Sequence, residues 1–191
     1  MSNDSDTIEL LKKVILDPNC SRMNQSTVKG YLGELLVKAK LEREGALVEH
    51  LGNQRGYDLQ FNHGGRPFKI DVKFSALKCE YCPGQNNWGW ALVHQNKKRP
   101  VSCTHFVCVA VDYQLEVIGY YVVSHNQVGR FPAGVGQFGR VKHGFILFED
   151  NSYAPDEGNK FFLLSETSRQ LRKDRTIIFV DKNESLLRAL S

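Results

Sequence analysis

Two adjacent glycines, Gly64 and Gly65, lie between two runs in which apolar and polar residues alternate, and this feature constrains the fold most. Both glycines can adopt positive φ, as the tight turn of a two-residue β-hairpin requires. The turn sets a register in which His63 faces Arg66 and Asn62 faces Pro67. Pro67 then falls at a non-hydrogen-bonded position, where its missing N–H removes no ladder bond. The sequence therefore predicts an antiparallel hairpin with strands over residues 57–62 and 67–74.

The same register places two carboxylates opposite each other. Asp58 faces Asp71 as a non-hydrogen-bonded pair with Cα atoms about 4.5 Å apart, and Lys69 and Lys73 point to the same face as Asp71. Opposed carboxylates destabilise a sheet unless a cation lies between them, and two oxygen ligands suit a Mg²⁺ ion that keeps several waters. The predicted opposite face carries Tyr57, Leu59, Phe61, Phe68, Ile70, Val72 and Phe74.

Two further charged residues complete a candidate catalytic cluster. An ammonium at Lys73 could orient or help deprotonate a water that attacks phosphorus, and could stabilise the developing charge. Upstream, residues 26–44 are predicted to form a helix with Ser26 as N-cap and Gly45 at its C-terminal end. Glu34 lies inside this helix and is expected to be partly buried, which is costly for a carboxylate that is neither paired nor metal-bound. The alternative is that these charges form an ordinary solvated face.

The remaining pattern predicts an α/β fold with a mixed sheet. A short helix over 7–17 precedes Pro18, and the stretch 129–140 is glycine-rich and predicted to be a long mobile loop. With 191 residues, the chain is expected to be one domain, with a catalytic core over about 26–124 and a C-terminal elaboration over about 125–191. Further strands are expected at 46–51, 104–112, 116–123, 144–148, 160–164 and 176–180, and helices at 166–173 and 184–190.

The motifs resemble the PD-(D/E)XK nuclease superfamily, whose fold is restriction-endonuclease-like, a mixed β-sheet flanked by helices. The matching residues are Gly30-Tyr-Leu-Gly-Glu34, Gly56-Tyr-Asp58 and Ile70-Asp-Val-Lys73, and Tyr57 replaces a proline that the family varies. The resemblance covers about residues 26–75. It implies phosphodiester hydrolysis that leaves a 5′-phosphate and a 3′-hydroxyl. It also implies that Asp58, Asp71 and the Val72 carbonyl bind Mg²⁺ (Mn²⁺ can substitute), that Glu34 acts through a metal-bound water, and that Lys73 positions the nucleophile.

Charge and composition are compatible with a nucleic-acid partner. The formal net charge is +4, which is mildly basic. Residues 85–103 and 117–148 contain no acidic residue and hold cations suited to contact the phosphate backbone of a duplex. The alternative for the first segment is a solvated loop in which Trp88 and Trp90 belong to the core. The candidate contacts are Lys97, Lys98, Arg99, Arg130, Arg140 and Lys142.

Other patterns limit the compartment and the metals. The longest apolar run, 106–111, is far short of a membrane span, and the acidic N-terminus is unlike a secretory signal. Five cysteines, an odd number, favour a reducing interior, so we expect a cytoplasmic protein of bacterial or phage origin. Cys79 and Cys82 have the spacing of a zinc knuckle, so they could bind structural zinc. The alternative is that the cysteines, including Cys108, are buried free thiols.

The sequence therefore predicts a Mg²⁺-dependent DNA endonuclease, of restriction type on duplex DNA and homodimeric. One alternative keeps the chemistry and changes the substrate to a Holliday junction or other branched DNA. Another is a non-catalytic nucleic-acid-binding module whose acidic cluster is structural.

Overall fold

The computed structural model describes residues 4–17, 19, 22–52, 56–77, 87–92, 102–130, 133–135, 141–148 and 177–191. Within them, two sheets form, one with strand order β1-β2-β3-β5-β6-β9 and one with order β4-β8-β7. In the larger sheet β3 and β5 run parallel and the other neighbours antiparallel, which confirms the predicted α/β class with a mixed sheet. The strands are β1 Glu49–His50, β2 Leu59–His63, β3 Arg66–Ala76, β4 Asn87–Leu92, β5 His105–Val111, β6 Val117–Ser124, β7 Ala133–Val135, β8 Val141–Phe148 and β9 Ile178–Asp181.

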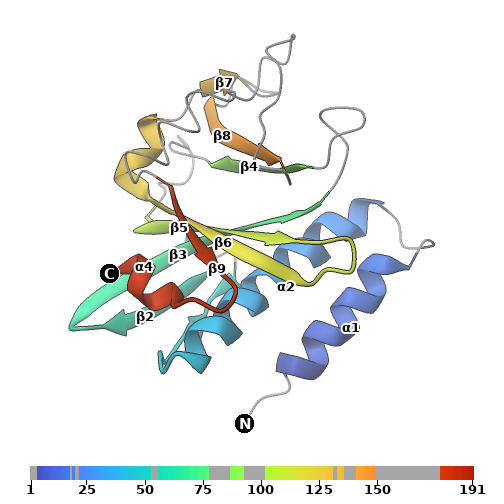
Figure 1. Ribbon diagram of the computed structural model, residues 1–191, viewed down its shortest axis with the longest axis horizontal. Helices are drawn as coiled ribbons and strands as arrows, with labels where there is room; N and C mark the ends of the chain where they lie inside the picture. The colour runs from blue at the N-terminus through green and yellow to red at the C-terminus, as the bar shows by residue number, and fades with distance from the viewer. Residues whose placement is uncertain are drawn as a thin grey trace.

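Helices cover one face of the larger sheet and the smaller sheet lies over the other (Figure 1). The helices are α1 Asp4–Leu16, α2 Arg22–Arg43 and α4 Leu186–Leu190, with a 3₁₀ helix η2 over His125–Arg130. On the helix side, Leu32 and Leu41 of α2 pack in one buried cluster with Ile70 of β3. On the other side, Trp88 and Trp90 of β4 pack in a second cluster. The larger sheet is therefore buried on both faces.

The predicted hairpin register is confirmed from His63↔Arg66 to Leu59↔Ile70, with φ of +56° at Gly64 and +74° at Gly65. The ladder ends there, however, and the N–H of Asp58 donates to the Ile70 carbonyl at 2.8 Å. The expected Asp58–Asp71 cross-strand pair therefore does not form. For the same reason Tyr57 does not share a face with Leu59 but belongs to the cluster under the smaller sheet, where Lys69 lies over its ring.

Helix α2 differs from its prediction at one end and agrees at the other. It begins at Arg22, so Ser26 lies inside the helix and is not its N-cap. At the C-terminal end Gly45 has φ +94°. The Gly45 N–H donates to the Glu42 carbonyl and the Ala46 N–H to the Leu41 carbonyl, which is the paired termination that glycine favours.

Several predicted segments need correction or lie outside the described residues. Residues 85–103 contain strand β4, which a loop interpretation missed, and residues 129–140 contain β7. Strand 46–51 is reduced to the two residues of β1. The predicted strand 160–164 and helix 166–173 lie outside the described residues.

The last helix is held by a carboxylate from the end of α2. Glu44 accepts hydrogen bonds from the N–H groups of Leu186 (3.0 Å) and Leu187 (2.8 Å) and from the hydroxyl of Ser185 (3.0 Å). These bonds lower the pKa of Glu44, although its partial burial acts in the opposite direction. An anion at the N-terminus of a helix is favourable, so Glu44 fastens α4 to the rest of the fold.

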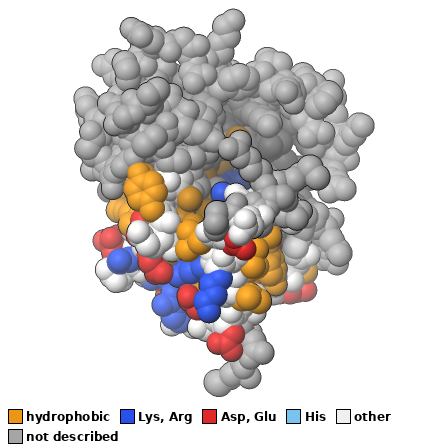
Figure 2. Space-filling model, turned by 90° about the vertical axis from the view of Figure 1, so that its right-hand side faces the viewer, with side chains coloured by type: hydrophobic (Ala, Val, Ile, Leu, Met, Phe, Trp, Pro, Cys, Tyr) orange, Lys and Arg blue, Asp and Glu red, His pale blue; other side chains and the backbone are white. Residues whose placement is uncertain are grey.

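The side of the molecule on which α1 lies carries mixed charges (Figure 2). Positive and negative side chains are interspersed there, and several are paired: Lys12 with Glu9 and Glu116, and Lys38 with Asp4. The described residues on this side therefore form no field of one sign. Among the described residues no helix is long and apolar enough to cross a membrane.

Candidate active site

The candidate site lies where the larger sheet loses a strand. Strand β2 pairs with β3 only as far as Ile70. Within the part of the chain that the structure describes, no strand pairs with the second half of β3, Asp71–Ala76, on that side, and we call this the free edge of β3. Helix α2 crosses over this edge, and β4 approaches it from the other face, where the Gly89 N–H donates to Ser75 Oγ at 3.1 Å. A cavity of about 380 Å³ opens here, lined by Ser26, Lys29, Gly30, Glu34, Asp58, Val72, Lys73, Phe74, Ser75, Ala76 and Gly89.

Gly33 allows the helix to approach the strand this closely. A Cβ at Gly33 would lie 3.0 Å from Cβ of Phe74 and 3.5 Å from Cγ1 of Val72. The contact leaves no room for a larger residue without movement of α2. Glu34, the next residue, is thereby held over the edge of β3 and is only 9% exposed.

Asp58 is fixed at the free edge through the backbone of β3. Its carboxylate accepts a hydrogen bond of 2.7 Å from the N–H of Val72. In a strand, the N–H and C=O of one residue point to the same side, so the Val72 carbonyl also lies along this free edge. Asp58 thus replaces the strand neighbour that β2 no longer provides.

Burial and the nearby Asp71 charge raise the pKa of Asp58 to about 7, against the lowering effect of the Val72 N–H. Glu34 contributes a further, smaller increase. A buried carboxylate whose pKa is raised by neighbouring negative charge would be stabilised in its ionised form by a nearby cation. The electrostatics therefore favour a positive ligand at this position.

Asp71 and Lys73 project from β3 toward the smaller sheet, and the ammonium of Lys73 donates to the carboxylate of Asp71. Burial raises the pKa of Asp71 and outweighs the opposing effect of Lys73. Burial lowers the pKa of Lys73, but the charges of Asp71 and Asp58 outweigh it and leave that pKa raised. Lys73 is therefore an ammonium at neutral pH and is suited to orient a water or stabilise an anion, not to act as a base.

Glu34 has a partner that the sequence did not indicate. Nε2 of His50 lies 2.5 Å from a carboxylate oxygen of Glu34, and the ring of His50 stacks on Tyr31 at a centroid distance of 5.5 Å. His50 belongs to β1, which has only two residues. A strand this short has no periodicity to predict, and the contact spans 16 residues, so only the fold reveals it.

The fold brings Glu34, Asp58 and Lys73 to one cavity, with Asp71 tied to Lys73 although it does not line the cavity. No cluster of three or more His, Cys, Asp or Glu in the described part of the chain is arranged to hold a metal ion. Asp58 and Asp71, with the Val72 carbonyl, nevertheless match the small set of protein oxygens that Mg²⁺ takes when water and substrate phosphate supply its other ligands.

The other predicted functional residues receive less support. Lys97, Lys98, Arg99 and Arg140 lie outside the described residues, as do Cys79 and Cys82. Arg130 ends η2 and Lys142 lies on β8, in positions where the backbone alone is described. Trp88 and Trp90 are buried in the core, as the alternative interpretation expected. Cys103 and Cys108 are buried free thiols.

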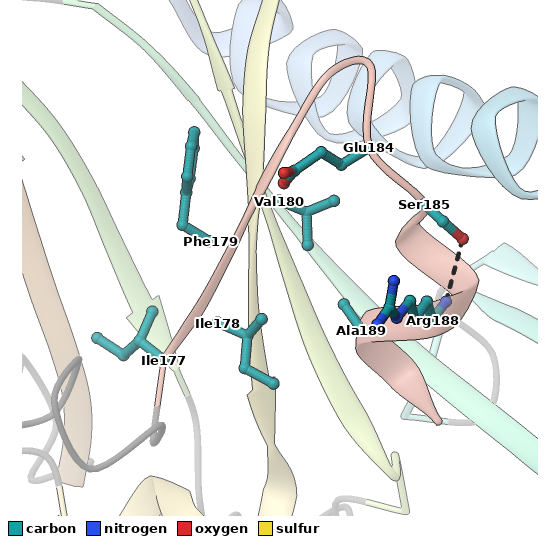
Figure 3. Close-up of a pocket in the computed structure, with 8 residues that line it drawn as sticks. All are labelled: Ile177, Ile178, Phe179, Val180, Glu184, Ser185, Arg188 and Ala189. Carbon is teal, nitrogen blue, oxygen red and sulfur yellow. Dashed lines mark hydrogen bonds between the residues drawn. The ribbon is translucent and has the colours of Figure 1, made fainter.

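A larger cavity, of about 650 Å³, lies between β9 and α4 (Figure 3). Ile178 and Val180 point toward α4, and Ile177 and Phe179 point to the other side of the strand. Its charged lining residues are Glu184 and Arg188. Its described lining includes no pair of buried carboxylates, so the chemistry points to the smaller cavity.

Comparisons with known proteins add little. No protein-family model matches the chain, and no curated protein matches it. A solved structure of the bacterial homing endonuclease I-Ssp6803I is similar, with a TM-score of 0.43 and 16% sequence identity, over 78% of this chain and 92% of that one. The functional conclusion therefore depends on the geometry of the site.

Proposed function

We propose that this protein is a Mg²⁺-dependent endonuclease of the PD-(D/E)XK type that hydrolyses phosphodiester bonds in duplex DNA. The observation that supports it is the meeting of Glu34, Asp58 and Lys73 in one cavity at the free edge of β3. These residues come from a helix, from the residue before β2 and from β3, and Lys73 is bonded to Asp71. Structural ion pairs do not need a cavity between them, whereas a substrate does.

The residues divide the chemistry in a definite way. Asp58, Asp71 and the Val72 carbonyl would hold the Mg²⁺ ion, and Glu34 would contact it through water. When bound, the ion acts as a Lewis acid toward the phosphate and lowers the pKa of bound water. The Lys73 ammonium lies beside these carboxylates and would orient the attacking water and stabilise charge that develops on the phosphate oxygens. His50 holds the Glu34 carboxylate in position.

DNA and self-association are part of the same proposal. The described residues of each chain form one such site, so cleavage of both strands of a duplex would need two copies, which a homodimer would supply. The mildly basic net charge of +4 is compatible with a polyanionic substrate.

Cleavage of supercoiled plasmid in Mg²⁺ tests the proposal. We expect cleavage that EDTA abolishes and that Lys73→Ala slows by at least about 100-fold. Lys13→Ala, an exposed lysine on α1, is the matched control and should cut at the wild-type rate. Glu34→Gln and a melting curve for each variant separate loss of chemistry from loss of folding.

The form of the product distinguishes the possible substrates. Discrete fragments indicate a restriction-type enzyme, whereas nicking alone directs the next assay to a synthetic four-way junction, the substrate of a resolvase. A folded protein that binds DNA but cuts neither substrate is a binding module, and the nuclease proposal would then be wrong.

A further inference from the structure

We infer that one face of α2, formed by Ser26, Lys29 and Gly30, is the surface on which the phosphodiester backbone of the substrate lies. Lys29 contacts a phosphate there, and Gly30, which has no side chain, leaves room on this face of α2 for the sugar-phosphate backbone. This inference rests on the proposed function, since it names the substrate-contacting part of the same cavity.

Helical periodicity places this surface beside the candidate catalytic residues. Ser26, Lys29, Gly30 and Glu34 follow the spacing i, i+3, i+4 and i+8, which puts them on one face of a helix. All four line the cavity together with Asp58 and Lys73. A strand that enters the cavity must therefore pass along this face of α2.

Lys29 is a cation with a free charge at an otherwise acidic cavity. Lys12, Lys38, Lys40 and Lys73 each form an ion pair, whereas Lys29 has no ion pair or hydrogen bond among the described residues. Its neighbours in the cavity include two carboxylates, which would repel a polyanion. A lysine in this position supplies the opposite charge that a phosphate needs at close range.

Gly30 and Gly33 have different structural reasons to be glycine. At Gly33 a Cβ would meet Phe74 at 3.0 Å, so the packing of α2 on β3 requires a glycine. At Gly30 a Cβ would meet nothing within 4 Å, and glycine in a helix interior costs stability relative to alanine. Folding alone therefore gives no reason for Gly30, whereas a substrate that needs the space does.

Salt-dependent binding tests the role of Lys29. The probe is a fluorescein-labelled duplex, titrated in Ca²⁺ so that binding is read without turnover. Because each phosphate contact contributes about 0.9 to the slope of log K against log salt, Lys29→Gln should reduce that slope by about 0.9 and weaken binding about tenfold. The matched control is Lys13→Gln on α1, an exposed lysine without an ion pair in the described residues, and it should leave the slope unchanged.

The glycines provide a second test. Gly30→Leu should raise the Tm or leave it unchanged but weaken duplex binding, whereas Gly33→Ala should lower the Tm. The inference would be overturned if Gly30→Leu and Lys29→Gln both bind the duplex as tightly as the wild type, with the same slope of log K against log salt. It would also be overturned if the wild-type protein shows no measurable binding of the duplex.

The plasmid assay separates this inference from the nuclease proposal. If the wild-type protein cleaves plasmid but Lys29→Gln leaves the salt dependence of binding unchanged, the nuclease proposal stands and the role of α2 is rejected. A reduced slope in a protein that cuts no DNA would retain α2 as the DNA-contacting surface and reject the nuclease.

Discussion

Asp58 has a structural role beside the chemical role that we propose for it. Its carboxylate satisfies the Val72 N–H at the point where β2 stops pairing with β3, and it interacts electrostatically with Asp71. The hydrogen bond keeps a buried carboxylate at the strand edge, and the neighbouring charge makes its ionisation costly. Without a cation, the folded protein therefore bears an electrostatic cost at this residue.

That cost makes the stability of the metal-free protein depend on pH. The pKa of Asp58 is about 7 in the folded protein and about 3.9 in an unfolded chain, so the folded state binds more protons between these values. The contribution of Asp58 is greatest below about pH 4 and is lost as the pH rises to about 7. We expect the Tm in EDTA to fall by several degrees relative to that of Asp58→Asn across this window. Parallel Tm profiles for the two proteins would contradict this.

His50 should act on catalysis through Glu34. Partners that orient groups at a metal site typically change activity by about 10–100-fold when they are replaced, so we expect His50→Ala to lower kcat by this factor with little change in KM for DNA. His50→Gln retains a hydrogen-bond donor and should recover part of the rate. His63→Ala, at the exposed tip of the hairpin, is the control. A wild-type kcat for His50→Ala would exclude a positioning role.

At the scale of elements, α4 depends on a residue far away in the sequence. The helix Leu186–Leu190 is too short to be stable alone, and its first N–H groups bond to Glu44 at the end of α2. The buried side chains of Leu186 and Leu190 add packing against the helix-side core. The docking of α4 therefore combines a charge-assisted cap with apolar contact.

Removal of the cap should destabilise the fold. We expect Glu44→Ala to reduce the free energy of unfolding by about 1–2 kcal/mol, measured by urea denaturation. Because the pKa of Glu44 is lowered in the folded protein, its contribution is present above the unfolded value of about 4.3 and is lost as the pH falls through the folded value. Glu42→Ala, which removes an exposed pair with Lys38, should change stability by less than about 0.5 kcal/mol. If Glu44→Ala and Glu42→Ala reduce the free energy of unfolding equally, Glu44 does not act as a cap of α4.

Local patterns predicted the elements better than their ends. Gly64, Gly65 and the alternating residues around them defined the hairpin register because a two-residue turn permits little else. Ser26 was misassigned as an N-cap because nothing in the sequence distinguishes it from a serine inside a helix. Strand β4 was missed although Trp88, Trp90 and Leu92 alternate, because the nearby cations suggested a loop.

At the scale of the whole molecule, the site lies at the boundary between two cores. Glu34 comes from the helix side of the larger sheet, whereas Asp71 and Lys73 face the smaller sheet. The sequence proposed four charged residues that lie within 40 positions of one another, and the fold brings Glu34, Asp58 and Lys73 to one cavity. The sequence could not indicate His50, or the displacement of Asp58 from the ladder, because both depend on where pairing stops in three dimensions.

The proposal of one catalytic site per chain has a consequence for the products of cleavage. If two copies act on one duplex, linear plasmid should rise more steeply than in proportion to protein concentration, and nicked plasmid should accumulate at low concentration. Sedimentation of the protein with a short duplex gives the stoichiometry independently. Linear product that forms without a nicked intermediate at every concentration would show that the active species is already a stable dimer.

The free edge of β3 also bears on the solubility of the protein. An unpaired strand edge is a template on which another chain can add a strand and begin aggregation, and inward-pointing charges are one protection against this. Here Asp58 occupies the edge and Lys73 flanks it. The charged residues that we propose for the chemistry would therefore also protect this edge of the sheet from pairing with another chain. Variants that neutralise Asp58 or Lys73, to Asn or Gln as well as to Ala, should therefore precipitate more readily than the wild type.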